Sequence, residues 1–286
     1  MRRKNNLTDA PITETNLDLK LFRKGKVRDV YEKDDNLLLI STDRLSAFDV
    51  VLPTGIPRKG EALNRISAYW FDQTKDIIPN HMIEVTDPRS MLVKKSVPVR
   101  AEFIVRGYLY GYAWRNYEAG KPISGVELPS GMRKAEKLPD SILTPTTKAD
   151  SGHDEEVTQK ELEAAIGKDV ADAVGEACLK IYERCSKMAL DRGIVIADTK
   201  FEFGHVGDEL ILIDEALTPD SSRFWDIEKY EVGGDPYSFD KQYVRDYLTS
   251  IGWNKEPPAP ELPDEVVAQT SARYVECFER VTGMKL

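Results

Sequence analysis

Two short apolar runs with charges at alternate positions constrain the fold of this chain more than any other feature. The first occupies residues 196–204 and the second begins at residue 212. Apolar residues that alternate with charged ones predict β-strands, and the short connection between the runs predicts a hairpin. Because successive side chains of a strand point to opposite faces, Asp198, Lys200 and Glu202 are expected on one face. The hairpin therefore has one buried face and one charged face.

The charged face admits two interpretations. Asp214, from the neighbouring strand, adds a further carboxylate to it, and a hard divalent cation with phosphate oxygens would neutralise such a group. A surface hairpin with weak, exposed ion pairs is the simpler alternative, and these residues alone leave both open. The turn at 218–223, with sequence TPDSSR, favours the first interpretation. Its hydroxyls, carboxylate and guanidinium suit the recognition of phosphate or carboxylate groups.

Strands and helices alternate along the chain without the rhythm of βαβ units, which predicts an α+β fold. The expected strands are 26–32 and 37–41, joined by a hairpin turn, then 82–85, 91–93 and 102–105. A capping box at Thr158 predicts the start of a helix, and apolar residues from Val170 to Met188 predict a long helix that ends near Gly193. Further helices are expected at 59–71, 237–251 and 264–281. The first hundred residues are therefore mostly strands, and the remainder is more helical.

Charge and composition exclude several classes of protein. The 286 residues carry a net charge of −9, which argues against a nucleic-acid partner. Residues 89–137 nevertheless contain ten Lys or Arg against four Glu, an excess that attracts small anions or forms a solvated basic face. No apolar run approaches the ~20 residues of a membrane span, and no secretory signal follows the N-terminus. We expect a cytoplasmic protein with no membrane partner, whose three cysteines are buried and unreactive.

Six segments in order carry a specific resemblance. They are 25–31 (GKVRDVY), 42–49 (TDRLSAFD), 102–108 (EFIVRGY), 147–154 (TKADSGHD), 197–204 (ADTKFEFG) and 214–226 (DEALTPDSSRFWD). Together they resemble the SAICAR synthetase family of purine biosynthesis. The resemblance implies a two-lobed, kinase-like architecture with ATP in the cleft. It divides the chain into a mainly antiparallel β lobe at 12–105, which covers ATP, and an α+β lobe at 106–286 with terminal helices and the metal and substrate site.

The resemblance also implies the residues for ATP and metal. Glu202 and Asp214 correspond to the Mg²⁺ ligands, which suits a cation that needs only a few carboxylates beside phosphate oxygens. Lys200 is expected at the transferring phosphoryl group, so these three are the predicted catalytic residues. The remaining cations expected to contact ATP are Lys26, Arg28 and Lys148. Without the resemblance, Lys26 and Arg28 are more simply interpreted as an exposed basic strand.

The expected substrate-binding residues follow in the same way. Arg106 and Arg223 have small and aromatic neighbours in the sequence, which fits guanidinium groups that are free to hold a substrate oxyanion. The family usually has Thr-Gly-Ser where this chain has Tyr110-Gly111-Tyr112, so the Tyr112 phenol replaces a serine hydroxyl and reaches further. The other expected substrate residues are Ser46, Asp49, His153, Asp154, Asp220 and Lys241. A turn role for Ser46 and Asp49 and a solvent-facing His153 are the simpler alternatives for those residues.

The activity implied by the resemblance is ATP-dependent ligation. Carboxyaminoimidazole ribotide (CAIR) and L-aspartate would give SAICAR, ADP and phosphate through an acyl phosphate, with ATP and Mg²⁺ required. A small-molecule kinase with the same ATP and metal residues is the main alternative. A non-catalytic nucleotide-binding module is the second, but Lys200, Glu202 and Asp214, whose loss would mark such a module, are all present.

Overall fold

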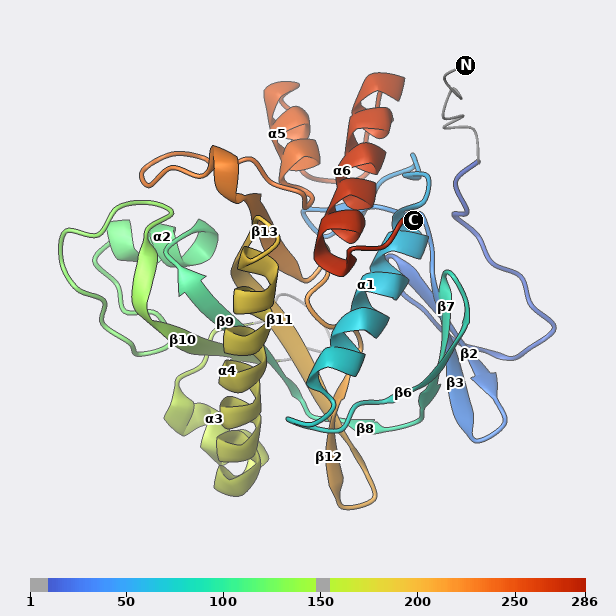
Figure 1. Ribbon diagram of the computed structural model, residues 1–286, viewed down its shortest axis with the longest axis horizontal. Coiled ribbons are helices and arrows are strands. Elements are labelled where there is room, and N and C mark those ends of the chain that lie inside the picture. Colours follow the sequence, from blue (N-terminus) through green and yellow to red (C-terminus); the bar gives the residue numbers. More distant parts are fainter. Residues whose placement is uncertain (1–9, 148–154) are drawn as a thin grey trace. The chain divides into compact units, whose positions relative to one another are not determined.

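The computed structural model describes residues 10–147 and 155–286, which form two compact units (Figure 1). Unit 1 consists of residues up to 69, 82–95 and 239–286, and unit 2 of residues 70–81 and 96–238. The expected α+β class is confirmed, and the strand pairs of every sheet are antiparallel. In the described part of the chain, no helix combines the length and apolarity needed to cross a bilayer.

A five-stranded sheet is the base of unit 1. Its strands, in spatial order, are β1 (Leu21–Lys24), β2 (Arg28–Lys33), β3 (Asn36–Ser41), β7 (Ser90–Lys94) and β6 (Met82–Asp87). The predicted hairpin of β2 and β3 is confirmed, with Asp34 at a positive φ of 53° in its turn. Its start differs from the prediction, because Lys26 lies in the bend between β1 and β2 and not on a strand. Lys26 and Arg28 therefore do not share one face of a strand.

Helices of unit 1 bury apolar faces that the sequence largely predicted. Helix α1 (Lys59–Thr74), which ends in unit 2, and helix α6 (Asp264–Thr282) confirm their predicted positions, and α6 buries Tyr274 and Phe278. Helix α5 (Gln242–Ser250) begins later than the predicted residue 237. The reason is that residues 237 and 238 pair with the strand at 222–226 in unit 2. A two-residue hairpin of β4 (Ser46–Ala47) and β5 (Val50–Val51) completes the unit.

Unit 2 contains the sheet that positions the candidate site. Strands β10 (Lys137–Thr147), β9 (Ala101–Tyr108), β11 (Ile194–Val206) and β12 (Glu209–Ile213) follow one another in space. Strands β13 (Ser222–Asp226) and β8 (Val97–Pro98) also pair with β11. The predicted hairpin of residues 196–213 is thus confirmed as β11 and β12. Strand β11 is the central element of the sheet, with partners along both edges.

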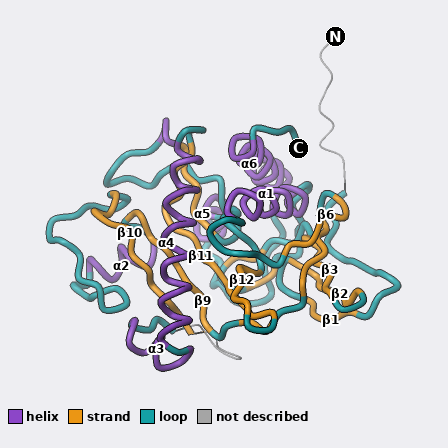
Figure 2. Tube along the Cα trace, turned by 60° about the horizontal axis from the view of Figure 1, so that its bottom comes forward, coloured by secondary structure: helices purple, strands orange, loops and turns teal. Residues whose placement is uncertain are grey.

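The helices of unit 2 are α2 (Gly111–Glu118), α3 (Gln159–Ile166), the long α4 (Lys168–Leu190) and a 3₁₀ turn at Ile227–Lys229. Helix α4 packs across β9, β10 and β11, as Figures 1 and 2 show. The predicted capping box is present, because Thr158 accepts from the Glu161 N–H and Glu161 accepts from the Thr158 N–H. The three cysteines are buried free thiols, as predicted. Helix α2 was not predicted.

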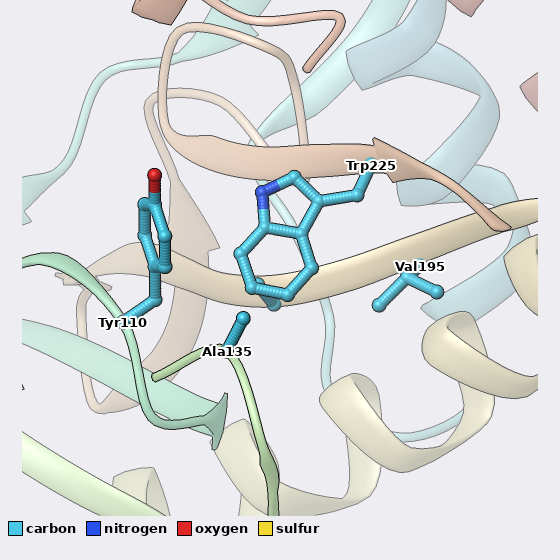
Figure 3. Packing of buried hydrophobic residues seen from close by; sticks show 5 residues of the cluster. Tyr110, Ala135, Val195 and Trp225 are labelled. Carbon is cyan, nitrogen blue, oxygen red and sulfur yellow. The ribbon is translucent and has the colours of Figure 1, made fainter. Parts of the chain in front are cut away.

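An aromatic cluster supports the start of α2 and the end of β13. Tyr110 and Trp225 meet edge to face with ring centroids 5.1 Å apart, and Ala135 and Val195 pack against them (Figure 3). The Tyr110 hydroxyl also donates a hydrogen bond to Asp235. Rings packed in this way fix the backbone on both sides of the cluster.

The compact units do not follow the single boundary expected at residue 105. The C-terminal residues 239–286 belong to unit 1 with the N-terminal sheet, whereas β8 and β9 belong to unit 2. The division into an ATP-covering lobe and a metal and substrate lobe remains a prediction about function.

Candidate functional site

The charged face of β11 holds a lysine between two carboxylates. Lys200 Nζ lies 2.6 Å from Glu102 Oε1 and 3.0 Å from Glu202 Oε1. The β9–β11 register pairs Phe201 with Phe103, which brings Glu102 of β9 beside Glu202. The predicted common face of Lys200 and Glu202 is therefore confirmed. Like charges side by side across two strands are destabilising unless a cation lies between them.

Burial strengthens the repulsion between the carboxylates of Glu102 and Glu202. The side chains of Glu102 and Glu202 are only 13% and 11% exposed. Burial raises the pKa of Glu102, and Glu202 raises it further, while Lys200 opposes both. Burial would lower the pKa of Lys200, but the carboxylates of Glu202, Glu102 and Asp214 outweigh it and hold the pKa above its ordinary value. The lysine is therefore charged and neutralises part of the negative charge of the two glutamates.

Glu102 is the residue of this cluster that the sequence did not indicate. A single glutamate in the alternating segment 101–106 is most simply interpreted as a solvated side chain. The sequence did contain one indication of its role. Glu102 is four positions before Arg106 on the same strand, so its side chain lies on the same face as that predicted site residue. Only the pairing of β9 with β11 turns that alternation into a shared site.

Asp214 follows β12 and has a φ of 69°, a left-handed conformation that is uncommon for a non-glycine residue. It lies close enough to Lys200 to raise that residue's pKa. Among residues 10–147 and 155–286, no group of three or more His, Cys, Asp or Glu is arranged to hold a metal on its own. The carboxylates fit a hard cation such as Mg²⁺ that takes its other ligands from phosphate oxygens and water.

A second group on the same strand joins two arginines through one carboxylate. Asp198 lies opposite Arg106 of β9 and opposite Arg223 of β13. Its Oδ2 accepts a hydrogen bond from Arg223 Nη1 and lies 3.7 Å from Arg106 Nη1. The expectation that both guanidinium groups are free is therefore wrong, because Asp198 pairs with them from across the sheet. Two guanidinium groups and one carboxylate leave an excess positive charge that attracts anions.

Arg106 is held firmly in this group. Its side chain is 8% exposed, and its Nε donates to Thr144 Oγ1 at 2.9 Å. Burial lowers the pKa of Arg106 and Asp198 opposes that effect, so the guanidinium stays protonated. The Cζ atom of the Arg106 guanidinium lies over the ring of Tyr112, 5.6 Å from the ring centroid.

The start of α2 lies against Arg223. Gly111 has a φ of 58°, and a Cβ there would be 2.6 Å from Arg223 Nη2, so a larger residue would strain the backbone and displace the guanidinium. The positive end of the α2 dipole thus adjoins the guanidinium, an arrangement that favours phosphate. The Tyr112 hydroxyl donates to Glu156 Oε2 at 2.7 Å. That phenol is therefore committed to a carboxylate in this structure.

Other predicted residues lie elsewhere in the described chain. In unit 1, Lys26 and Asp49 form an ion pair of 2.6 Å, and both side chains are more than half exposed. Ser46 begins β4, and Lys241 is buried just before α5. In unit 2, the Asp220 N–H donates to Thr218 Oγ1 within the predicted turn. Lys148, His153 and Asp154 lie outside the described residues.

The turn between β4 and β5 has an unusual backbone. Its two central residues, Phe48 and Asp49, have φ values of 52° and 66°, the signature of a tight hairpin turn that normally requires Gly or Asn. The Phe48 ring packs near Trp253, with centroids 6.3 Å apart, and Lys255 Nζ lies 4.7 Å from its centroid. Strain of this kind often accompanies ligand-contacting segments, and the role of Asp49 stays a prediction.

A cavity of about 670 Å³ lies between α4 and strands β9, β10 and β11. Its lining includes Gly107, Leu138, Tyr182 and Ile196, and none of the predicted site residues. The charged groups described above therefore do not line this cavity, and its size does not make it the candidate site.

Comparison with known proteins gives consistent results. The SAICAR synthetase family model matches residues 21–260. The phosphoribosylaminoimidazole-succinocarboxamide synthase of Thermodesulfovibrio yellowstonii is 50% identical, covering 95% of this chain and 99% of its own. The solved SAICAR synthase from Saccharomyces cerevisiae complexed with SAICAR has a TM-score of 0.89 at 38% identity, covering 96% and 99% of the two chains. A SAICAR synthetase solved with ADP, at 24% identity, shares the fold with a TM-score of 0.71 over 92% and 98% of the two chains.

Proposed function

This chain belongs to the SAICAR synthetase family and is a carbon–nitrogen ligase of purine biosynthesis, and from that premise we propose how its residues divide the reaction. The substrates are ATP, CAIR and L-aspartate, and the products are SAICAR, ADP and phosphate. A carboxylate oxygen of CAIR attacks the γ-phosphorus of ATP and ADP leaves. The aspartate nitrogen then attacks the acyl carbon, phosphate leaves, and the nitrogen loses a proton as the amide forms.

One observation carries this proposal: β11 presents two separate charged groups on one face. Lys200, with Glu102 and Glu202, forms one group, and Asp198, which joins two arginines, forms the other. Lys200 and Asp198 are two positions apart on the strand, about 7 Å along it. Two groups at this spacing would hold two anionic substrates close together and in a fixed order, which would supply much of the catalysis of a bimolecular step.

We assign the first group to ATP and Mg²⁺. Glu202 and Asp214 would hold the metal, with Glu102 beside them, and Mg²⁺ when bound would spread the charge of the phosphoryl group. Lys200 donates to the phosphoryl oxygens, and its raised pKa keeps it charged during the transfer. The further ATP contacts proposed are Lys26, Arg28 and Lys148.

The second group is assigned to the ribosyl phosphate of CAIR. Arg106 and Arg223 carry the positive charge, and Asp198 fixes their orientation from the strand between them. The start of α2 at Gly111 adds backbone N–H groups on the same side. The hydroxyl of Tyr112 bonds to Glu156, so we propose that Tyr112 acts through its ring against Arg106. The other substrate contacts proposed are Ser46, Asp49, His153, Asp154, Asp220 and Lys241.

The small-molecule kinase alternative is not favoured. A kinase needs the first group but has no use for an amine acceptor beside an acyl phosphate. Family membership over residues 21–260 and the high-identity relatives both support the ligase. Mg²⁺ as the metal, and the residue roles above, stand as our proposal.

ADP release measured with ATP, Mg²⁺ and CAIR, with and without L-aspartate, tests the activity. We expect ADP release that requires both substrates and matches SAICAR formation mole for mole. Equal ADP release without aspartate would contradict the ligase and point to a kinase. For the metal site, Glu202→Gln and Asp214→Asn should abolish turnover while the protein stays folded. Lys180→Gln, on the exposed side of α4, is the matched control and should keep full activity.

A further inference from the structure

A single buried guanidinium holds the bend between β1 and β2 from inside unit 1. Arg44 is 5% exposed. Its Nε donates to the Lys26 carbonyl at 3.1 Å and its Nη2 to the Gly25 carbonyl at 3.0 Å. The remaining donors bond to Thr13 O at 2.7 Å and to both carboxylate oxygens of Asp29 at 2.6 and 3.2 Å. An arginine has five N–H donors, and these five bonds use all of them.

Because every donor is occupied within the protein, Arg44 has none left for a substrate. Asp29, its carboxylate partner, is 2% exposed and also accepts from Thr15 Oγ1 at 2.7 Å. Burial would raise the pKa of Asp29, but the bonds from Arg44 and Thr15 outweigh it and lower the pKa. The pair is therefore an ionised, fully bonded anchor inside the unit.

The anchor determines which way the bend presents its N–H groups. In a planar trans peptide the C=O and N–H point in opposite directions. Arg44 holds the carbonyls of Gly25 and Lys26, so the N–H groups of Lys26 and Val27, which belong to the same peptides, turn away from Arg44. The next carbonyl, that of Val27, accepts two hydrogen bonds from Thr42, which lies two residues before Arg44. The Thr42 N–H donates at 3.0 Å and the Thr42 hydroxyl at 2.8 Å. Successive N–H groups on one side of a turn form a concavity that binds anions.

Gly25 also determines the conformation of the bend. Its N–H donates to the Arg28 carbonyl at 2.7 Å, and an added Cβ would lie 2.9 Å from that oxygen. A side chain at this position would push the bend away from the carbonyl positions that Arg44 recognises. The bend thus depends on a glycine on one side and a guanidinium on the other.

We propose that Arg44 is a positioning residue for nucleotide binding, which holds the Gly25–Lys26 carbonyls inward so that the following N–H groups face the ATP phosphates. This inference rests on the proposed contact of Lys26 and Arg28 with ATP. Arg44 itself touches no substrate. A lysine at this position has one nitrogen and cannot bond two successive carbonyls and both Asp29 oxygens together.

The test is calorimetric titration of the full chain with ADP and Mg²⁺, together with steady-state kinetics. Arg44→Lys should weaken ADP binding and raise KM for ATP at least tenfold, while KM for CAIR and for aspartate stays within twofold. Gly25→Ala should do the same without altering the buried Arg44–Asp29 pair, and it decides the matter if Arg44→Lys does not fold. The controls are Thr15→Val, which removes the outer bond to Asp29 and the bond to the Tyr31 hydroxyl but leaves Arg44 in place, and Gly175→Ala on α4, where a Cβ has room. Both should bind ADP like the wild type.

Two outcomes would overturn the inference. The first is wild-type ADP binding by both Arg44→Lys and Gly25→Ala. The second is an equal loss for all three substrates, because a merely structural role predicts that pattern. Lys26→Ala separates the inference from its premise. If Lys26→Ala weakens ADP binding and the two positioning variants do not, the inference alone is wrong, whereas unchanged binding in Lys26→Ala refutes the assignment of this segment to ATP.

Discussion

Removing the charge of Lys200 should destabilise the protein in a way that depends on pH. In Lys200→Met, Glu102 and Glu202 lose the cation that lies 2.6 and 3.0 Å from their oxygens. Two carboxylates that both contact one nitrogen are within about 6 Å of each other, and Lys200 is 31% exposed, so an effective dielectric of about 20 applies. The unscreened pair then costs about 3 kcal/mol of folding free energy.

The sign of the pH dependence follows from Glu102. Its folded pKa is raised, so its contribution to stability is fully present below its unfolded pKa and is lost as the pH rises through the folded pKa. Lys200 opposes that rise, so its loss raises the pKa further. At pH 5.5, protonating a glutamate with an ordinary pKa of about 4.3 costs about 1.6 kcal/mol, which is less than the repulsion. At pH 8 protonation costs about 5 kcal/mol, so the repulsion persists.

Differential scanning calorimetry in EDTA at both pH values measures this effect. At about 2–4 °C per kcal/mol, the Tm of Lys200→Met should fall about 6–12 °C below wild type at pH 8 and about 3–6 °C below it at pH 5.5. The double variant Lys200→Met/Glu102→Gln lacks the Glu102–Glu202 pair and should show the same Tm deficit at both pH values. An equal deficit for the single variant at pH 5.5 and pH 8, or a pH-dependent deficit in the double variant, would refute the electrostatic reasoning.

Three further predictions concern other parts of the chain. Gly111→Ala should raise KM for CAIR about tenfold and leave ADP affinity unchanged, because the added Cβ would collide with Arg223. Steady-state kinetics measures this effect, and an unchanged KM for CAIR would contradict the assignment of the Arg106–Asp198–Arg223 group to CAIR. Thr158→Ala should cost about 1 kcal/mol in urea unfolding with full activity, because it removes the capping box, and a loss of activity would argue against a purely structural role. Thiol titration of the native protein should detect none of the three buried cysteines until denaturant is added, and rapid modification would show that they are accessible.

Much of the fold was predictable because its signals are local. The alternation in 196–206, the helical spacing in 168–190 and the capping box each depend on residues a few positions apart. The predicted helix at 237–251 failed in its first turns for the opposite reason. Residues 237 and 238 pair with β13, and no local pattern reports a partner from another segment.

The candidate site also combines features that the sequence predicts with contacts that it does not predict. The sequence by itself determined which residues of β11 share a face, because a strand has a period of two, and its motifs determined the family. Only the tertiary structure decided what each of those residues meets. It brought Glu102 to Lys200, joined Arg106 and Arg223 through Asp198, and closed the five donors of Arg44 on the bend at Gly25. Strand register and side-chain packing couple residues distant in sequence, so such contacts leave no pattern along the chain.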